Sequence, residues 1–215
     1  MSEYLFSVFK DITKLKWYSI AIVSLLFLIS LFLMGSRRRQ TLSTKAIVYG
    51  GLCIALSFTL SFIKLYRMPQ GGTITPASML PLFVYSYIFG PFAGVIAGVA
   101  YGILQLIQDP YVVHWAQLLL DYPLAFGALG VAGCFKKSLP AGIVFGGLGR
   151  FFMHFVSGFL FFASYAPKGT NPVWYSAIYN ATYLGPDLIL CLIVALIPGV
   201  SKAIQQLKKE IVLKP

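Results

Sequence analysis

Long apolar stretches separated by short polar breaks dominate the chain. Seven such stretches can be outlined: 17–35, 45–66, 78–89, 91–108, 115–134, 140–165 and 174–200. A helix needs about 20 apolar residues to cross the hydrocarbon core of a bilayer, and all but the short third stretch approach that length. The pattern predicts an all-α, polytopic membrane bundle of seven helices.

Composition supports one membrane domain without a soluble one. Of the 215 residues, 58% are hydrophobic and 11% are charged, and no polar segment is long enough for a second core. Cys53, Cys134 and Cys191 lie in apolar runs without metal-ligand spacing, which favours a packing role.

Basic residues set the expected orientation. The net charge is +11, and its main clusters lie just outside apolar stretches: Arg37–Arg39, Lys45, Lys136–Lys137, Lys202, Lys208, Lys209 and Lys214. Cytoplasmic loops carry such an excess, so we interpret the charge as membrane orientation and not as nucleic-acid binding. The C-terminus is then cytoplasmic and the N-terminus outside. Lys10, Lys14 and Lys16 oppose that rule, and we expect 17–35 to be a retained, peripheral helix.

Four polar side chains fall inside the apolar stretches: Asp121, His154, Asn180 and Asp187. A charge at mid-helix costs about 2.5–3.5 kcal/mol on insertion scales, so such residues are functional candidates. Asp187 and His154 reach similar depth and form a hypothetical pair, with an internal water as the alternative partner of Asp187. Arg150 is nearer a helix end, where we expect its side chain to extend toward the interface.

Aromatic residues gather around Asp121. His154, Gly158 and Phe162 share one helix face, and a tyrosine stripe runs beside Asn180 on the last stretch. At the depth of Asp121 we expect further rings: Tyr111, Trp115, Tyr122, Trp174 and Tyr175. A carboxylate among rings suits an organic cation, because both attract positive charge. The sequence therefore predicts a cation site that opens to the outside.

Small residues mark the expected packing seams. Gly90, Gly94, Gly98 and Gly102 recur every four residues, a spacing that favours close helix contact inside the bundle. Gly51 and Ala55 form a shorter ridge, whose neighbour is either another helix of this chain or another subunit.

Four segments carry a resemblance to a known family: "MPQGGTITPASMLPLF", "QLLLDY", "RFFMHFVSGFLFFASYAPKGT" and "VWYSAIYNATYL". They resemble the thiamine-specific substrate-binding subunits (S-components, ThiT or YuaJ type) of energy-coupling factor transporters, over residues 45–200. The resemblance implies six helices in a bacterial cell membrane, a thiamine pocket open to the outside, and no cofactor. It also implies partnership with one membrane scaffold subunit and two ATPases.

The resemblance implies roles for individual residues. Asp121 would meet the thiazolium ring of thiamine, and further contacts would come from Tyr111, Tyr122, His154, Gly158, Phe162, Tyr165, Tyr175 and Asn180. Gly51 and Ala55 would contact the scaffold. The chain departs from the family where some members have Trp: it has Gly71-Gly72, Phe162 and Pro167, so pyrimidine stacking would come from Phe162 or Trp174.

Three segments follow from this interpretation. Residues 1–40 form an extra transmembrane helix and a basic linker, 41–202 a six-helix substrate-binding membrane domain, and 203–215 a cytoplasmic basic tail. The predicted helix over 17–35 has no counterpart in the family.

Other functional classes fit less well. "GCFKKS" lacks the glycine spacing of a phosphate-binding loop, so ATP hydrolysis would need another subunit. His114 and His154 are forty residues apart, and no HExxH or GxSxG motif occurs, which disfavours an enzyme. A self-contained proton- or cation-coupled transporter of thiamine or a cationic precursor stays open, since Asp121 and Asp187 could carry protons.

Overall fold

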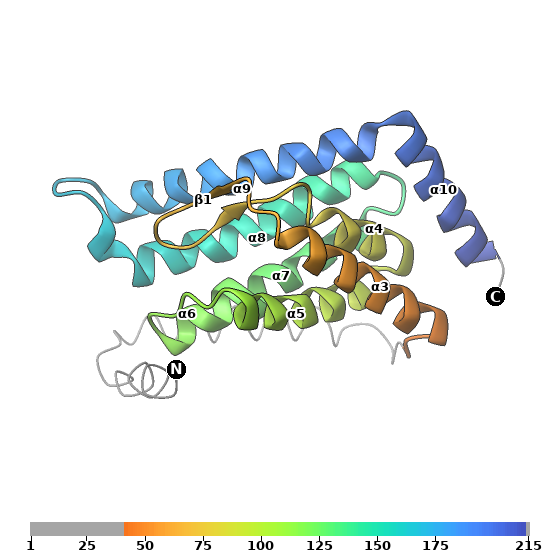
Figure 1. The fold of residues 1–215 in the computed structure, drawn as a ribbon, viewed down its shortest axis with the longest axis horizontal. Coiled ribbons are helices and arrows are strands. Elements are labelled where there is room, and N and C mark those ends of the chain that lie inside the picture. The colour runs from red at the N-terminus through yellow and green to blue at the C-terminus, as the bar shows by residue number, and fades with distance from the viewer. Residues whose placement is uncertain (1–40, 214–215) are drawn as a thin grey trace.

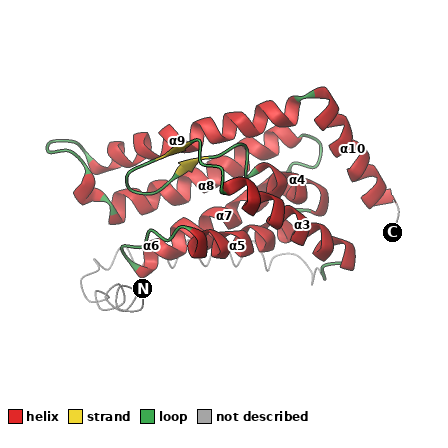
Figure 2. Cartoon of the chain, viewed as in Figure 1, coloured by secondary structure: helices red, strands yellow, loops and turns green. Residues whose placement is uncertain are grey.

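The computed structural model describes residues 41–213, so the predicted helix over 17–35 and the position of the N-terminus lie outside the described residues. The described part is helical almost throughout (Figure 2). Its main helices are α3 (Thr44–Ser61), α4 (Leu80–Phe89), α5 (Pro91–Gln108), α6 (Trp115–Leu119), α8 (Leu139–Phe161), α9 (Pro172–Leu196) and α10 (Pro198–Leu213). Five helical stretches in this part are long and apolar enough to cross a membrane. The chain is a multi-pass, all-α membrane protein, as predicted.

Side-chain caps and prolines fix the helix starts. Ser43 accepts a hydrogen bond from the Ala46 amide at 3.1 Å, Ser138 from Ala141 and Asn171 from Val173. Caps of this kind satisfy backbone N–H groups that have no partner within the helix. Helices α5 and α9 begin at a proline, which is favoured in the first turn.

The segment between α3 and α4 forms a small hairpin that the hydrophobic pattern did not predict. Strands β1 (Tyr66–Arg67) and β2 (Thr73–Ile74) pair antiparallel. The Met68 amide donates to the Gly72 carbonyl at 2.9 Å. Gly71 and Gly72 have φ angles of 83° and 90°, which residues with a Cβ rarely adopt. The glycine pair therefore makes the tight reversal possible.

The stretch predicted as one helix over 115–134 changes its winding along its length. After α6 it continues as a π-helical turn, η2 (Leu120–Leu124), then α7 (Ala125–Gly127) and a 3₁₀ segment, η3 (Ala128–Cys134). Pro123 lies inside η2, and proline lacks the N–H that an α-helix needs while its ring crowds the preceding turn. Wider winding relieves that crowding, and Asp121 lies in this turn.

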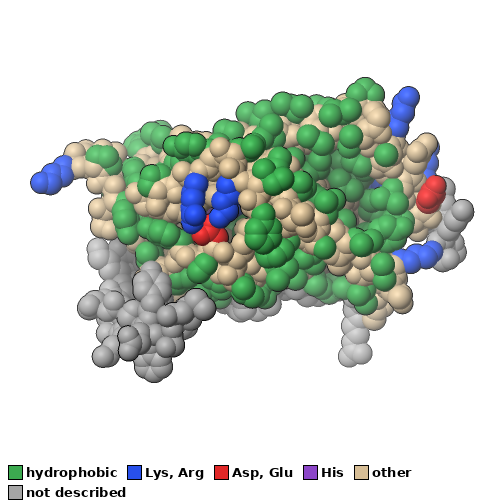
Figure 3. Space-filling model, viewed as in Figure 1, with side chains coloured by type: hydrophobic (Ala, Val, Ile, Leu, Met, Phe, Trp, Pro, Cys, Tyr) green, Lys and Arg blue, Asp and Glu red, His purple; other side chains and the backbone are tan. Residues whose placement is uncertain are grey.

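The helices run roughly along one axis, with loops at one end of the bundle and α10 at the opposite end (Figure 1). Helices α8 and α9 lie side by side and make the most extensive contact between two helices. The hairpin lies over them at the end away from α10. Hydrophobic side chains are spread over much of the face in Figure 3, and charged side chains are few there, as expected for a surface that contacts lipid tails.

Helix α10 packs against the end of the bundle opposite the hairpin. Ile204 is buried in the same core cluster as Leu82 and Phe83 of α4, and the Lys208 ammonium lies 3.4 Å from the centroid of the Tyr87 ring. The residues from 203 onward, expected as a basic tail, are thus helical as far as Leu213.

The glycine ridge of α5 packs within this chain, as expected. Its partner is the irregular helix that carries Asp121. A Cβ on Gly98 would lie 2.8 Å from the Phe126 carbonyl carbon, and one on Gly102 2.5 Å from the Tyr122 carbonyl oxygen. Gly90 differs, since among the described residues no packing atom lies within 4 Å of its Cβ position, and its φ of 93° turns the chain between α4 and α5.

We expect Gly98→Val to destabilise the bundle, because backbone atoms on the facing helix cannot move aside as a flexible side chain can. Overpacking of this kind costs about 1–3 kcal/mol. A thermal melt of the purified protein in detergent would measure it, with Gly185→Ala as the control, because no packing atom in the described part of the chain lies within 4 Å of that Cβ position. Equal melting temperatures for both variants would contradict close packing at Gly98.

Candidate functional site

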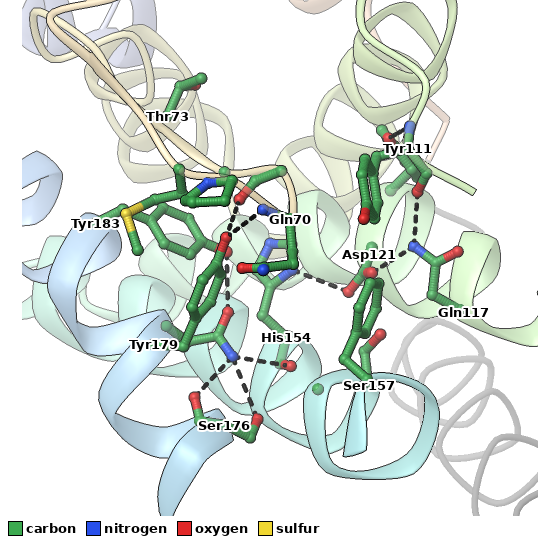
Figure 4. Close-up of a pocket in the computed structure, with 18 of the residues that line it drawn as sticks. Gln70, Thr73, Tyr111, Gln117, Asp121, His154, Ser157, Ser176, Tyr179 and Tyr183 are labelled. Atoms are coloured by element: carbon green, nitrogen blue, oxygen red, sulfur yellow. Dashed lines mark hydrogen bonds and ion pairs between the residues drawn. The ribbon is translucent and has the colours of Figure 1, made fainter. Parts of the chain in front are cut away.

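A cavity of about 400 Å³ lies at the end of the bundle that carries the hairpin. Its walls come from the loop before β2, the segment around Tyr111, the η2 turn, α8 and α9 (Figure 4). Small-molecule sites in proteins typically measure about 300–1,000 Å³. The cavity is therefore large enough for a small organic ligand.

Asp121 lies on the cavity wall with both carboxylate oxygens engaged. Its Oδ1 is 2.9 Å from His154 Nδ1, and its Oδ2 accepts a hydrogen bond from Gln117 Nε2 at 2.6 Å. The side chain keeps 14% exposure. A carboxylate oxygen has more than one acceptor position, so the group can still meet a ligand. The structure thus brings together Asp121 and His154, two residues predicted from separate helices.

Gln117 orients Asp121 and was missed by the sequence analysis. Its amide oxygen accepts from the Val113 N–H at 3.1 Å, while its amide nitrogen donates to the Tyr111 carbonyl at 3.0 Å as well as to Asp121. These partners fix the amide with its nitrogen toward the carboxylate. The i, i+4 spacing from Gln117 to Asp121 was the available signal.

Arg150 does not extend to the membrane interface, contrary to expectation. It is 9% exposed and lines the cavity. Its Nε donates to His154 Nε2 at 3.3 Å, and its guanidinium carbon lies 4.2 Å from the centroid of the Phe126 ring. The i, i+4 spacing to His154 turns the side chain inward, where a ring and hydrogen bonds replace water.

The predicted pairing of Asp187 with His154 is wrong. Asp187 is 2% exposed, and its Oδ1 accepts from Thr75 Oγ1 at 3.0 Å. Thr75 also bonds Ser78 at 2.6 Å. Asp187 therefore anchors the segment that leads from the hairpin into α4.

Several predicted aromatic residues line the cavity. The rings of Tyr111 and Phe162 stack with centroids 5.9 Å apart, and Tyr175 lies 5.8 Å from Tyr179 on the next turn of α9. The lining set includes Tyr111, Tyr122, Phe162, Tyr175, Tyr179 and Tyr183. These rings surround Asp121 as the sequence indicated.

Other predicted rings lie elsewhere. Trp174 is 69% exposed and is absent from the cavity wall, so it does not supply the expected stacking surface. Trp115 packs beside His114, and Tyr165 is 44% exposed at the rim, with its hydroxyl 3.5 Å from that of Tyr111. Trp174 is on an exposed side of its helix, which the helical periodicity of the sequence alone did not reveal.

Tyr122 and Asn180 line the cavity, but both have partners within the protein. The Tyr122 hydroxyl accepts from the Tyr111 amide at 2.8 Å and donates to the Asp109 carbonyl at 3.0 Å. Asn180 donates to the His154 carbonyl at 3.2 Å and accepts from the Tyr183 hydroxyl at 3.0 Å. Each therefore holds two chain segments of the cavity together.

Tyr179 holds the hairpin over the cavity, a role that the sequence analysis did not assign. Its hydroxyl accepts from the Gln70 amide and donates to the Gly71 carbonyl, both at 2.9 Å. Next to it, a Cβ on Gly72 would lie 2.9 Å from the Tyr183 ring. Gly72 thus lets the hairpin backbone approach α9 closely.

Comparisons with known proteins agree with this geometry. The model of the family described as "Thiamine transporter protein (Thia_YuaJ)" matches residues 47–207, about three quarters of the chain. The chain belongs to this family. Membership agrees with the expectation that the protein is not an enzyme, since the family is named for transport.

Two curated relatives of this thiamine transporter family member share one name with each other. It is 41% identical over 145 aligned positions to "Thiamine transporter ThiT" of Bacillus subtilis, covering 59% of this chain and 74% of the relative. The Lacticaseibacillus paracasei protein of that name is 34% identical, with 47% of this chain and 61% of the relative covered. A solved structure of ThiT from Listeria monocytogenes has the same fold, with a TM-score of 0.66, 23% identity, and coverage of 74% of this chain and 96% of that one.

Proposed function

We propose that the chain binds thiamine in this cavity and serves as the substrate-binding subunit of an energy-coupling factor transporter. The carrying observation is Asp121, an acceptor held on a cavity wall among aromatic rings. Thiamine has a fixed positive thiazolium, a flat aminopyrimidine and a hydroxyethyl arm. The carboxylate would face the thiazolium, and Phe162 with Tyr111 would offer a stacking surface.

Charge distribution supports a cavity that opens to the outside. Six lysines belong to α10, to the start of α3 or to the loop before α8, at the end that carries α10: Lys45, Lys136, Lys137, Lys202, Lys208 and Lys209. At the opposite end Lys168 is exposed, while Lys64 and Arg67 are both bonded to Asp109, at 2.5 and 2.6 Å. The positive-inside rule then makes the α10 end cytoplasmic. Thiamine would enter from the opposite side.

Titration calorimetry of the purified chain tests the proposed ligand. We expect thiamine to bind with 1:1 stoichiometry, and the uncharged pyrimidine precursor to bind at least about tenfold more weakly because it lacks the thiazolium charge. Thiamine phosphates in the same series would show whether the hydroxyethyl arm points out of the cavity. Absence of thiamine binding, or equal binding of the neutral precursor, would contradict the proposal.

Partners can be tested by reconstitution. We expect proteoliposomes that hold only this chain to bind thiamine without accumulating it, because uphill transport needs the scaffold subunit and two ATPases. Adding that module with ATP should give uptake. Accumulation by the chain alone under a proton or cation gradient would favour a self-contained transporter.

The scaffold contact is proposed at the Gly51–Ala55 ridge of α3. No atom of the described residues lies within 4 Å of a Cβ built on Gly51, and Ala55 is exposed. Leu52 and Leu56 beside them are 61% and 54% exposed. A smooth apolar ridge without a neighbour in this part of the chain suits close approach by another membrane helix.

We expect Gly51→Trp to reduce ATP-driven uptake at least about tenfold while thiamine affinity stays within about threefold, because the indole would block the scaffold and lies away from the cavity. Uptake in proteoliposomes and calorimetry measure the two effects. Ile178→Trp is the matched control, an exposed apolar position on α9. Equal uptake by both variants would remove the α3 ridge from the contact.

A further inference from the structure

A buried cation lies unexpectedly close to the proposed cation site. Arg150 is one helical turn before His154 on α8 and is 9% exposed. Its Nη1 contacts Met79 Sδ at 2.7 Å, its guanidinium carbon lies over the Phe126 ring, and its Nε points at His154 Nε2 at 3.3 Å. A positive charge here does not stabilise the thiazolium ring, which directs attention to the contacts of Arg150 with its protein neighbours.

The contact with Arg150 determines where the imidazole of His154 carries its proton. A guanidinium can only donate hydrogen bonds, and a histidine nitrogen accepts one only when it has no proton. His154 Nε2 is therefore the acceptor, and the proton is on Nδ1. That nitrogen is 2.9 Å from Asp121 Oδ1, so the neutral ring donates to the carboxylate.

We propose that Arg150 is a positioning residue that keeps His154 neutral and Nδ1-protonated, and so preserves the negative charge of Asp121 for a cationic ligand. The proposal rests on the proposed function, since it assumes that Asp121 meets the thiazolium ring. A protonated His154 would place N–H against N–H at Arg150 and would form an ion pair with Asp121. The carboxylate would then have its counter-ion before thiamine arrived.

The charges around His154 support this role. The groups that face it are Asp121 from η2, Arg150 from α8 and Tyr183 from α9, whose ring is 6.1 Å away by centroid. With His154 neutral, the Asp121 carboxylate keeps a negative charge on the cavity wall that a monovalent cation can meet. Protonation of His154 would cancel it.

The tautomer can be tested without ligand. The chain has two histidines, so ¹⁵N-histidine labelling gives two imidazole spectra, and His114→Asn assigns them. We expect long-range ¹H–¹⁵N correlations to show His154 protonated at Nδ1 and unprotonated at Nε2 between about pH 6 and pH 8. An Nε2-protonated ring or an imidazolium in that range would overturn the proposal.

The second arm measures the pH dependence of thiamine affinity in Arg150→Met. Without the guanidinium, His154 can take up a proton as pH falls from about 8 to 6 and pair with Asp121. Affinity should then fall by up to about tenfold per pH unit, the limit for one linked proton. Wild type, Arg150→Lys and the surface control Lys168→Met should change by less than about threefold.

Other outcomes separate this role from a structural one. A loss of affinity in Arg150→Met by the same factor at every pH would mean that Arg150 only supports the fold, and would overturn the proposal. If Arg150→Met does not fold, the wild-type tautomer decides. Failure of the wild type to bind thiamine would contradict the proposed function, while the tautomer measurement would still test Arg150.

Discussion

Asp121→Asn should lower thiamine affinity by about 2–5 kcal/mol, or roughly thirty- to several-thousand-fold. The substitution keeps the shape of the side chain but removes the charge that faces a desolvated cation. It also replaces an oxygen by an amide nitrogen, and both neighbours of Asp121 that we identify, Gln117 Nε2 and His154 Nδ1, are placed to donate. One donor would therefore meet another donor. Calorimetry on the purified variant measures the loss.

Two comparisons make the Asp121 result specific. Asp121→Glu keeps the charge and should weaken binding far less. Asp109→Asn removes a second carboxylate of the cavity wall, one that is already paired with Lys64 and Arg67, so it measures the effect of a neutralised carboxylate, which we expect to stay below about tenfold. An Asn variant that melts like the wild type and binds thiamine within a few fold would exclude Asp121 from the site.

Hydrophobic pattern was sufficient for the membrane fold because each transmembrane helix must satisfy its own backbone inside the lipid. The predicted stretches 91–108 and 174–200 correspond to α5 (Pro91–Gln108) and to α9 with the start of α10. The hairpin was not predictable in this way. Its strands have two residues each, which is too short to show an alternating hydrophobic pattern. Its position depends on tyrosines of α9 that are remote in sequence.

The irregular helix around Asp121 shows a different limit. Pro123 signals a disturbance in the predicted stretch 115–134, but the sequence does not say whether the chain will kink, break or widen. In the structure the turn widens into η2, and the glycines of α5 contact its backbone directly. Pro123 requires a disturbance of the helix, and the close contact with α5 limits the form it can take. The wider winding therefore depends on tertiary packing as well as on the local sequence.

Candidate residues were easier to predict than their partners. Asp121 and His154 were identified because an ionisable side chain in an apolar stretch is costly. Gln117 was not, since an amide near a helix start has an ordinary explanation at the membrane interface. Arg150 was assigned to a helix end, although it lies midway along α8 (Leu139–Phe161). Both contact the predicted pair through i, i+4 spacing on their own helices. Polar residues four positions before a buried ionisable residue are therefore the first candidates for its hydrogen-bond partners.

Gly158 lines the cavity where α8 and α9 meet, and besides the ligand contact that the resemblance implied it has a packing role. A Cβ at this position would lie 3.0 Å from Ser176 Cβ and 3.2 Å from Asn180 Nδ2, with the Ser176 hydroxyl closer still. That hydroxyl donates to the Phe155 carbonyl at 2.7 Å. The glycine therefore lets two helices approach closely enough for Asn180 to reach the His154 carbonyl.

Gly158→Ala should weaken thiamine binding by about five- to 150-fold, the equivalent of about 1–3 kcal/mol of overpacking. The added methyl group would push Ser176 and Asn180 outward and move α9, which carries Tyr175 and Tyr179, away from the wall that carries Asp121. Calorimetry at a temperature well below the melting transition measures the affinity. Gly185→Ala is the matched control, because it makes the same change on α9 where no packing atom of residues 41–213 lies within 4 Å, and it should bind like the wild type. Equal affinity in the two variants would show that the α8–α9 distance does not govern the site.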